Sequence, residues 1–106
     1  MESISALDLR VRMDSEVDAP VLLDVREGWE FEICRIPGSR LLPMSELPGL
    51  LNDMDKQAPI VVICHHGIRS YQAALFLERT GFERVSNLTG GIEAWADAVN
   101  PAMPRY

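Results

Sequence analysis

The feature of the sequence that most constrains the fold is a continuous apolar run, Ile60-Val61-Val62-Ile63. Because no polar residue alternates with the apolar ones, the run predicts a strand that is buried on both faces. A strand of this kind is typical of a parallel sheet with helices packed on both sides. The run therefore favours an α/β architecture.

Other stretches of the chain supply the remaining elements of such a sheet. Further strands are predicted at 21–25, 40–42 and 85–88. Helices are predicted at 5–13, 26–33, 45–51, 70–80 and after 89–91. We expect Ser5, Ser45 and Ser70 to cap three of these helices, and Gly81 to end the one that Ser70 begins. Because the predicted strands alternate with helices, the chain is expected to form β-α units around a parallel sheet.

Charge and composition exclude several classes of partner. The chain of 106 residues has a net charge of −6 and no basic stripe, which argues against nucleic acid and against an anionic membrane surface. Its apolar runs, such as Ile60–Cys64, are far shorter than the ~20 residues of a membrane span, and we expect no export signal. The two cysteines, Cys34 and Cys64, lack metal-binding spacing. We therefore expect reduced thiols in the cytoplasm, no metal and no cofactor.

The segment after the apolar run carries the most specific chemical signal. Cys64-His65-His66-Gly67-Ile68-Arg69 (the Cys64 loop), followed by Ser70, joins a predicted buried strand to a predicted helix. Ligands bind beyond the carboxyl ends of parallel strands. Consecutive backbone N–H groups in such a turn, together with the helix N-terminus, favour an anion. We therefore expect Cys64 to be held as a nucleophilic thiolate rather than to be a small core residue.

This loop resembles the active-site loop of single-domain rhodaneses, which follows the pattern Cys-x-x-Gly-x-Arg-Ser. Three more stretches are similar to motifs of the same family, in the same order: Leu22–Glu27, Ile36–Ser39 and Asn87–Trp95. The resemblance covers about residues 4–98 and leaves an irregular tail at 99–106. It implies a single rhodanese-like domain at 1–106, of class α/β, whose small central parallel sheet is flanked by helices on both faces.

The resemblance also implies an activity, that of a thiosulfate sulfurtransferase. Such an enzyme moves a sulfane sulfur from a small anionic donor such as thiosulfate to a thiol or cyanide acceptor, and a sulfur-relay protein is a further expected partner. By position, Cys64 is the catalytic nucleophile that carries a persulfide, and Arg69 is the catalytic residue that orients the donor or holds the loop. Substrate binding is assigned to His65, His66, Gly67, Ile68 and Ser70.

Two other functions stay open on the sequence alone. One is a Cys-dependent phosphatase or arsenate reductase of related topology. The dual-specificity phosphatases of this topology have one more residue between the loop cysteine and arginine, whereas here four residues separate Cys64 from Arg69. Some rhodanese-like domains only bind partners, although these commonly lack the cysteine. The chain departs from the family at Arg35, where a histidine is common. The His65-His66 pair either adds positive charge near an anionic donor, shuttles a proton, or is simply solvated.

Side chains outside the Cys64 loop are expected to be structural. Asp24 and Arg26 should pair with neighbouring groups and fix the end of their strand. Trp29 and Trp95 are expected in the core or in a pocket wall. Cys34 is expected to be a structural thiol, with a resolving thiol as the alternative.

Overall fold

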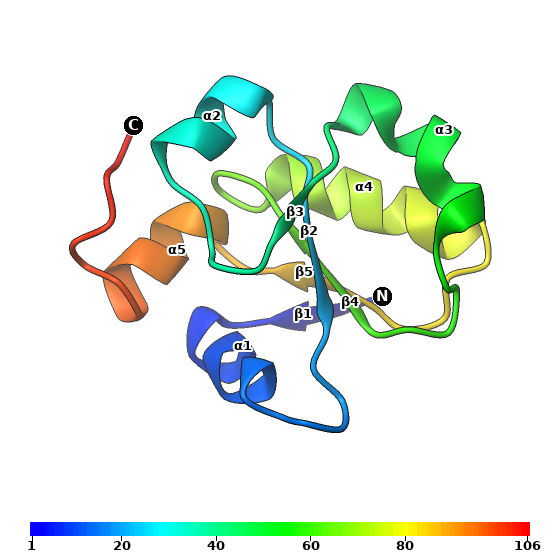
Figure 1. The fold of residues 1–106 in the computed structure, drawn as a ribbon, viewed down its shortest axis with the longest axis horizontal. Coiled ribbons are helices and arrows are strands. Elements are labelled where there is room, and N and C mark those ends of the chain that lie inside the picture. Colours follow the sequence, from blue (N-terminus) through cyan, green and yellow to red (C-terminus); the bar gives the residue numbers. More distant parts are fainter.

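Five parallel strands form one sheet in the order β1-β5-β4-β2-β3 (Figure 1). The computed structural model describes residues 1–106, except for the side chains at positions 50 and 51. The strands are β1 (Glu2–Ile4), β2 (Val21–Asp24), β3 (Arg40–Leu41), β4 (Ile60–Ile63) and β5 (Val85–Leu88). The helices are α1 (Ala6–Met13), α2 (Gly28–Ile33), α3 (Leu47–Leu50), α4 (Ile68–Arg79) and α5 (Gly91–Ala98). Short 3-10 turns occupy Met44–Glu46 and Leu51–Asp53.

Two apolar clusters lie on opposite faces of this sheet. Successive side chains of a strand point to opposite faces, and β4 contributes Val61 and Ile63 to one cluster and Ile60 and Val62 to the other. The first cluster includes residues of α1 and α5, whereas the second includes residues of α3 and α4. The predicted α/β class, with helices on both faces of a parallel sheet, is confirmed.

The register of the central strands brings their carboxyl ends to one edge of the sheet. Asp24 of β2 pairs with Ile63 of β4, and Val62 of β4 pairs with Asn87 of β5. Just beyond the strand ends, the N–H of Val25 donates to the carbonyl of Ile63 at 2.9 Å. The segments that follow β2, β4 and β5 therefore leave the sheet side by side, at the edge where parallel sheets bind ligands.

The helix after the Cys64 loop begins earlier than predicted. Ser70 is not its N-cap, because α4 begins at Ile68 and its N-cap is Gly67, with a φ of 100°. This left-handed backbone is one that glycine adopts without steric cost. Ser70 instead lies in the first turn of α4 with its side chain buried. The predicted end of this helix is confirmed, since Gly81 follows it with a φ of 103°.

One strand near the surface was not predicted, and one predicted helix cap there is wrong. Strand β1 was not expected, because two of its three residues are exposed and its sequence lacks an apolar run; it exists through its pairing with β5. Ser45 does not cap a helix over 45–51, because it lies inside the 3-10 turn Met44–Glu46. Among the helices that the structure describes, none has the length and apolar character needed to cross a membrane.

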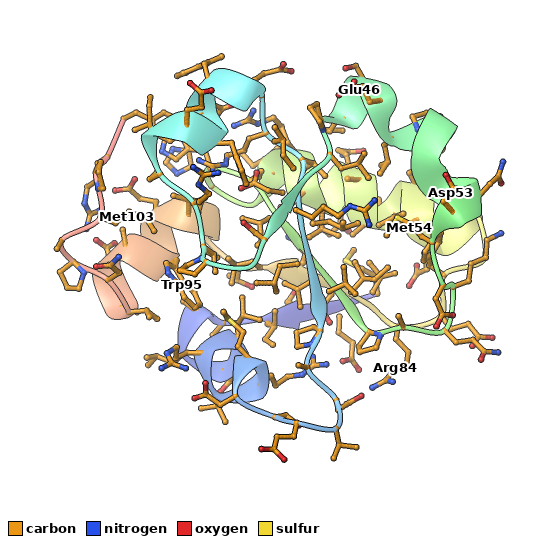
Figure 2. The ribbon with its side chains drawn as sticks, viewed as in Figure 1. Glu46, Asp53, Met54, Arg84, Trp95 and Met103 are labelled. Atoms are coloured by element: carbon orange, nitrogen blue, oxygen red, sulfur yellow. The ribbon has the colours of Figure 1, made fainter. Side chains whose placement is uncertain are left out.

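The two tryptophans differ in burial. Trp95 on α5 is 3% exposed and lies in the first apolar cluster together with Met103 of the C-terminal segment (Figure 2). Trp29 on α2 is 60% exposed, so the expectation of a core position is wrong for this residue. The Trp29 ring instead packs edge-on against Tyr106, with 5.6 Å between the ring centroids.

Candidate active site

The sulfur of Cys64 lies directly after β4 and is held by two groups of the turn into α4. The backbone N–H of Gly67 donates to Sγ at 3.1 Å, and the thiol donates to the Ser70 hydroxyl at 3.2 Å. Cys64 is 1% exposed, so a reagent must be small or the loop must shift to admit it. Because α4 begins beside the sulfur, the positive end of the helix dipole lies next to it.

Asn87 of β5 connects this turn to the sheet. Its Nδ2 donates to the carbonyl of Gly67 at 3.1 Å, and its Oδ1 accepts a hydrogen bond from the Ser70 hydroxyl. Asn87 is 6% exposed, and an amide buried in a strand is costly unless it is bonded. Its amide side chain within a predicted strand, between Val85 and Leu88, was the signal that could have identified it as a site residue.

The backbone of the Cys64 loop is fixed by the start of α5. The N–H of Ile92 donates to the carbonyl of Cys64 at 2.8 Å, and the N–H of Glu93 donates to that of His65 at 3.1 Å. The approach is so close that a Cβ on Gly91 would lie 2.3 Å from the Cys64 carbonyl oxygen. Gly91 also has a φ of 59°, so it meets both a steric and a conformational requirement.

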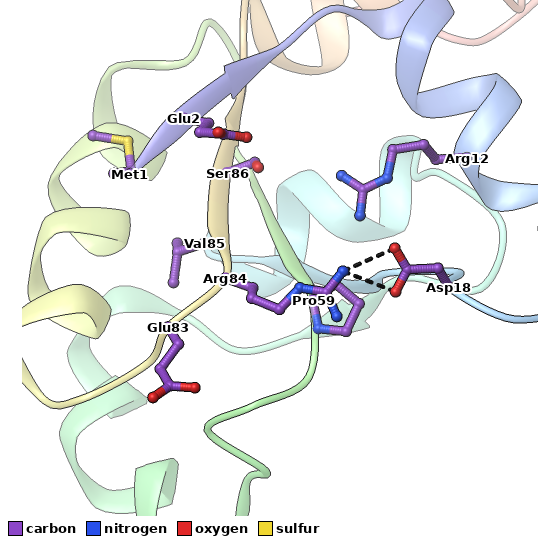
Figure 3. A pocket seen from close by; sticks show the side chains of 9 residues that line it. All are labelled: Met1, Glu2, Arg12, Asp18, Pro59, Glu83, Arg84, Val85 and Ser86. Carbon is purple, nitrogen blue, oxygen red and sulfur yellow. Dashed lines mark hydrogen bonds and ion pairs between the residues drawn. The ribbon is translucent and has the colours of Figure 1, made fainter.

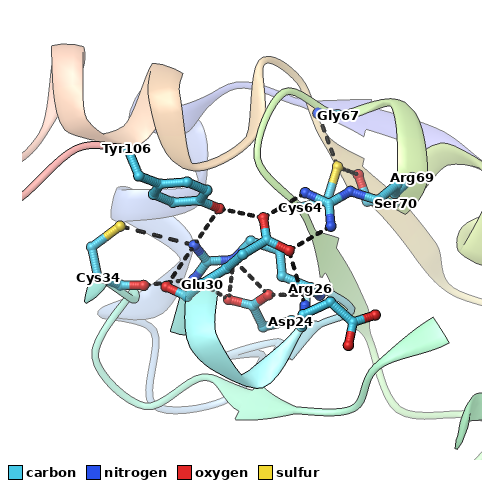
Figure 4. Close-up of polar contacts among 10 residues, drawn as sticks. Asp24, Arg26, Glu30, Cys34, Cys64, Gly67, Arg69, Ser70 and Tyr106 are labelled. Atoms are coloured by element: carbon cyan, nitrogen blue, oxygen red, sulfur yellow. Dashed lines mark hydrogen bonds and ion pairs between the residues drawn. The ribbon is translucent and has the colours of Figure 1, made fainter. Parts of the chain in front are cut away.

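Arg69 forms a two-point ion pair with Glu30 of α2 (Figure 4). Its Nη1 and Nη2 donate to Oε1 and Oε2 of Glu30 at 2.6 and 2.7 Å. The Arg69 side chain is 39% exposed, whereas that of Glu30 is 4% exposed. Hydrogen bonds from Arg69 lower the pKa of Glu30 to about 2, even though burial opposes the shift. The same pairing raises the pKa of Arg69, which keeps a permanent cation next to the Cys64 loop.

Asp24 and Arg26 pair with neighbouring groups as predicted, and the structure shows that they also pair with each other in a fully buried ion pair. Nη2 of Arg26 donates to Oδ2 of Asp24 at 2.7 Å, and both side chains are 0% exposed. Arg26 also donates to the carbonyl of Cys34 at 2.6 Å. Burial lowers the pKa of Arg26, but the bonds to Asp24 and Tyr106 outweigh this and raise it. The cation thus ties the end of β2 to the segment after α2.

Aromatic rings stack beside the Cys64 loop. The rings of His65 and His66 stack with 4.0 Å between centroids, and Tyr106 stacks on His65 at 4.1 Å. Nε2 of His65 lies 3.4 Å from a carboxylate oxygen of Glu93, without hydrogen-bond geometry. His66 is exposed at the surface. Of the two histidines, His65 therefore makes more contacts with the surrounding side chains.

The structure brings together some of the predicted site residues and not others. Gly67 and Ser70 contact the Cys64 sulfur, and Arg69 stands beside it on α4. Ile68 is 75% exposed at the surface, so its side chain faces solvent. The residues that were not predicted, and that shape this region, are Glu30, Asn87, Gly91 and Tyr106.

A cavity of about 460 Å³ lies elsewhere in the fold (Figure 3). It is lined by the starts of the strands, including Glu2, Val85 and Ser86, whereas Cys64 follows the end of β4. Within it, Arg84 donates to both oxygens of Asp18 at 2.8 Å. This cavity is therefore at the opposite end of the strands from the Cys64 sulfur.

The low pKa of Glu30 makes stability depend on pH in a defined window. A carboxyl group whose pKa is lower in the folded state stabilises the fold above its unfolded pKa, here 4.5, and loses this effect as the pH falls to about 2. We expect wild type to lose on the order of 2–3 kcal/mol of unfolding free energy across this window relative to Glu30→Gln, whose side chain does not titrate there. Urea denaturation of both proteins at several pH values measures this. A constant difference between them would contradict the assignment.

Comparison with known proteins agrees with this geometry. The chain matches the family described as rhodanese-like domain over residues 5–98. It is 36% identical over 84 residues to the thiosulfate sulfurtransferase GlpE of Shewanella oneidensis, an alignment that covers 79% of this chain and 83% of that protein.

Other relatives are longer or are known as structures. The chain is 34% identical over its whole length to the rhodanese-like/PpiC domain-containing protein 12, chloroplastic, of Arabidopsis thaliana, but spans 38% of that protein. The crystal structure of a rhodanese-related protein from Thermoplasma volcanium matches with a TM-score of 0.85 and 34% identity, covering 95% of this chain and 96% of that one. On this evidence, the chain belongs to the rhodanese-like domain family.

Proposed function

We propose that the protein is a sulfurtransferase that moves a sulfane sulfur from thiosulfate, through a persulfide on Cys64, to a thiol or cyanide. The observation that carries this proposal is the position of the Cys64 sulfur. It lies at the N-terminus of α4, accepts a hydrogen bond from the Gly67 N–H and has Arg69 beside it. Backbone donors and a helix N-terminus stabilise a thiolate, and the thiolate is the nucleophilic form of cysteine.

In the first half-reaction, the Cys64 thiolate attacks the outer sulfur of thiosulfate. A bond forms between Sγ and that sulfur, the bond from that sulfur to the SO3 group breaks, and sulfite leaves with the electron pair. The negative charge on Cys64 is kept on the terminal sulfur of the persulfide. Gly67 already donates to Sγ, and the neighbouring N–H groups of the loop are suited to receive the added sulfur.

The Ser70 hydroxyl can reverse its hydrogen bond with the Cys64 sulfur when the thiol loses its proton. Its hydroxyl carries one hydrogen, which it donates to Asn87 while the thiol of Cys64 donates to it. Once Cys64 has lost its proton, the hydroxyl can turn and donate to the thiolate instead. Ser70 therefore stabilises the attacking anion without a change of backbone position.

Arg69 supplies the positive charge for the anionic donor. Its bonds to Glu30 use one N–H on each Nη, which leaves further N–H groups of the guanidinium for the oxygens of thiosulfate. The side chain is 39% exposed, so these groups are open to a ligand. In the second half-reaction the acceptor attacks the terminal sulfur; with cyanide, this releases thiocyanate and restores the Cys64 thiolate.

The named relatives support sulfur chemistry over the alternatives. The aligned GlpE protein is a thiosulfate sulfurtransferase, and a putative sulfur carrier protein of Bacillus subtilis is 34% identical over 93 residues. Transfer to a sulfur-relay protein in the cytoplasm is thus compatible with the proposal. The presence of Cys64 argues against a domain that only binds partners, and the short spacing to Arg69 argues against the wider phosphatase loop.

Intact mass after treatment with thiosulfate tests the proposal. We expect one added sulfur per chain, which cyanide removes, and negligible hydrolysis of an aryl phosphate by the same sample. Hydrolysis of the phosphate that depends on Cys64, without any added sulfur, would establish the phosphatase alternative. Neither reaction at all would favour a partner-binding domain.

A further inference from the structure

We propose that Tyr106 is a positioning residue of this active site, which acts through Glu30 to fix the guanidinium of Arg69 where it meets an anionic donor. The inference deepens the proposed function and rests on its premise that Arg69 contacts the donor. It also assigns a role to the C-terminal segment, which the sequence predicted only as an irregular tail.

The hydroxyl of Tyr106 bridges two ion pairs (Figure 4). It donates to Oε2 of Glu30 at 2.7 Å and accepts from Nη1 of Arg26 at 2.9 Å. Oε2 of Glu30 is also the atom that accepts from Nη2 of Arg69 at 2.7 Å. The fully buried Arg26 is therefore connected, through one hydroxyl and one carboxylate, to the exposed guanidinium of Arg69.

The carboxylate of Glu30 is saturated with donors in this arrangement. Its Oε1 accepts from Arg69 and from the N–H of Glu27 at 3.0 Å, and its Oε2 accepts from Arg69 and Tyr106. An ionised carboxylate offers about four acceptor sites, and all of them are used. The plane of the carboxylate, and with it that of the paired guanidinium, is thus fixed on both sides.

The ring of Tyr106 is held independently of its hydroxyl. It stacks on His65 at 4.1 Å and meets Trp29 edge-on at 5.6 Å. Upstream, Met103 is 6% exposed in the apolar core, and Arg105 pairs with Glu93 at 2.6 Å. A phenylalanine would keep the packing of the ring and remove only the hydroxyl.

The hydroxyl also keeps its proton over the pH range in which a thiolate works. Burial raises the pKa of Tyr106 to about 12, so the hydroxyl remains a donor to Glu30. Without it, Oε2 of Glu30 and Nη1 of Arg26 each lose a partner. Glu30 then has freedom to rotate, and Arg69 rotates with it.

Two alkylating reagents of equal size and different charge test this role. Iodoacetate is an anion and iodoacetamide is neutral, so the ratio of their rates at Cys64, read by peptide mass spectrometry, reports the positive charge presented to an anion. The steric barrier to the buried sulfur cancels in this ratio. The ratio does not depend on sulfur transfer.

We expect Tyr106→Phe to lower the ratio of iodoacetate to iodoacetamide rates about three- to tenfold, which corresponds to the net contribution of one ordinary hydrogen bond. Its rate with iodoacetamide should match that of wild type, its KM for thiosulfate should rise, and its kcat should change little. The matched control is Tyr71→Phe, because Tyr71 is exposed at 45% and its hydroxyl forms no hydrogen bond among the described residues; this variant should behave as wild type. Arg69→Gln should lower the ratio at least as far as Tyr106→Phe does.

An unchanged ratio in Tyr106→Phe, together with a lowered one in Arg69→Gln, would overturn the positioning role. An unchanged ratio in Arg69→Gln would overturn it as well, because the premise that Arg69 meets the anion would be wrong. A lowered ratio in Tyr106→Phe in a protein that gains no sulfur from thiosulfate would support the role of Tyr106. The same result would contradict only the proposed sulfur transfer, and it would leave the positioning role of Tyr106 intact.

Discussion

Serine in place of Cys64 is expected to abolish transfer of sulfur from thiosulfate to cyanide, with a loss on the order of 10³-fold or more, as is typical when a catalytic nucleophile is removed. An oxygen cannot hold the transferred sulfur as a stable persulfide. The fold should persist, because a serine hydroxyl can still contact the Gly67 N–H and the Ser70 hydroxyl. Release of thiocyanate measures the activity, and circular dichroism checks the fold.

The matched control for this variant is Cys34→Ser. Cys34 is also buried, but its sulfur lies 3.8 Å from Nη1 of Arg26, within the first apolar cluster, and not at the start of α4. We expect most of the activity to remain in this variant. Near-normal turnover by Cys64→Ser, or an equal loss in both variants, would refute the assignment of Cys64 as the sulfur carrier.

Alanine in place of Gly91 should displace the Cys64 loop. The new Cβ would lie 2.3 Å from the carbonyl oxygen of Cys64 and 2.5 Å from that of His65, so the loop backbone must move. The positive φ of 59° adds backbone strain of about 1–3 kcal/mol. Because a displacement of about 1 Å can cost on the order of 10²-fold in rate, we expect a loss of that size in sulfur transfer.

The variant Gly38→Ala separates the backbone strain of a positive φ from the steric contact with the Cys64 loop. Gly38 also has a positive φ, of 84°, but a Cβ added there has no neighbour within 4 Å. This variant should be destabilised by strain alone, to an extent that urea denaturation measures, and should transfer sulfur at the wild-type rate. Equal activities for the Gly38 and Gly91 variants would show that the contact between α5 and the loop does not control the reaction.

The parts of the fold that the sequence predicted are those set by local pattern. The apolar run of β4 predicted a strand buried on both faces, and the pattern from Cys64 to Ser70 predicted a turn into a helix. The start of that helix was misplaced because serine is a common N-cap, whereas here the backbone needs the positive φ that Gly67 provides.

The residues that the sequence did not reveal act across long stretches of chain. Glu30 is separated from Arg69 by 39 positions and from Tyr106 by 76. Asn87 is 20 positions from Gly67. No periodicity or cap signal encodes such contacts, because they exist only after the sheet has brought its strand ends together. In the sequence, Glu30 and Asn87 stood out only as polar residues within a predicted helix and a predicted strand.

The hydrogen bonds from the start of α5 to the Cys64 loop also have a consequence for the order of synthesis. A chain made from its N-terminus carries the Cys64 thiol well before it carries Asn87, Gly91, Ile92 and Tyr106. During this interval β4 lacks its neighbour β5, and no group yet fixes the carbonyls of Cys64 and His65. The nascent chain therefore holds the Cys64 thiol well before it holds the groups that fix the geometry of the Cys64 loop.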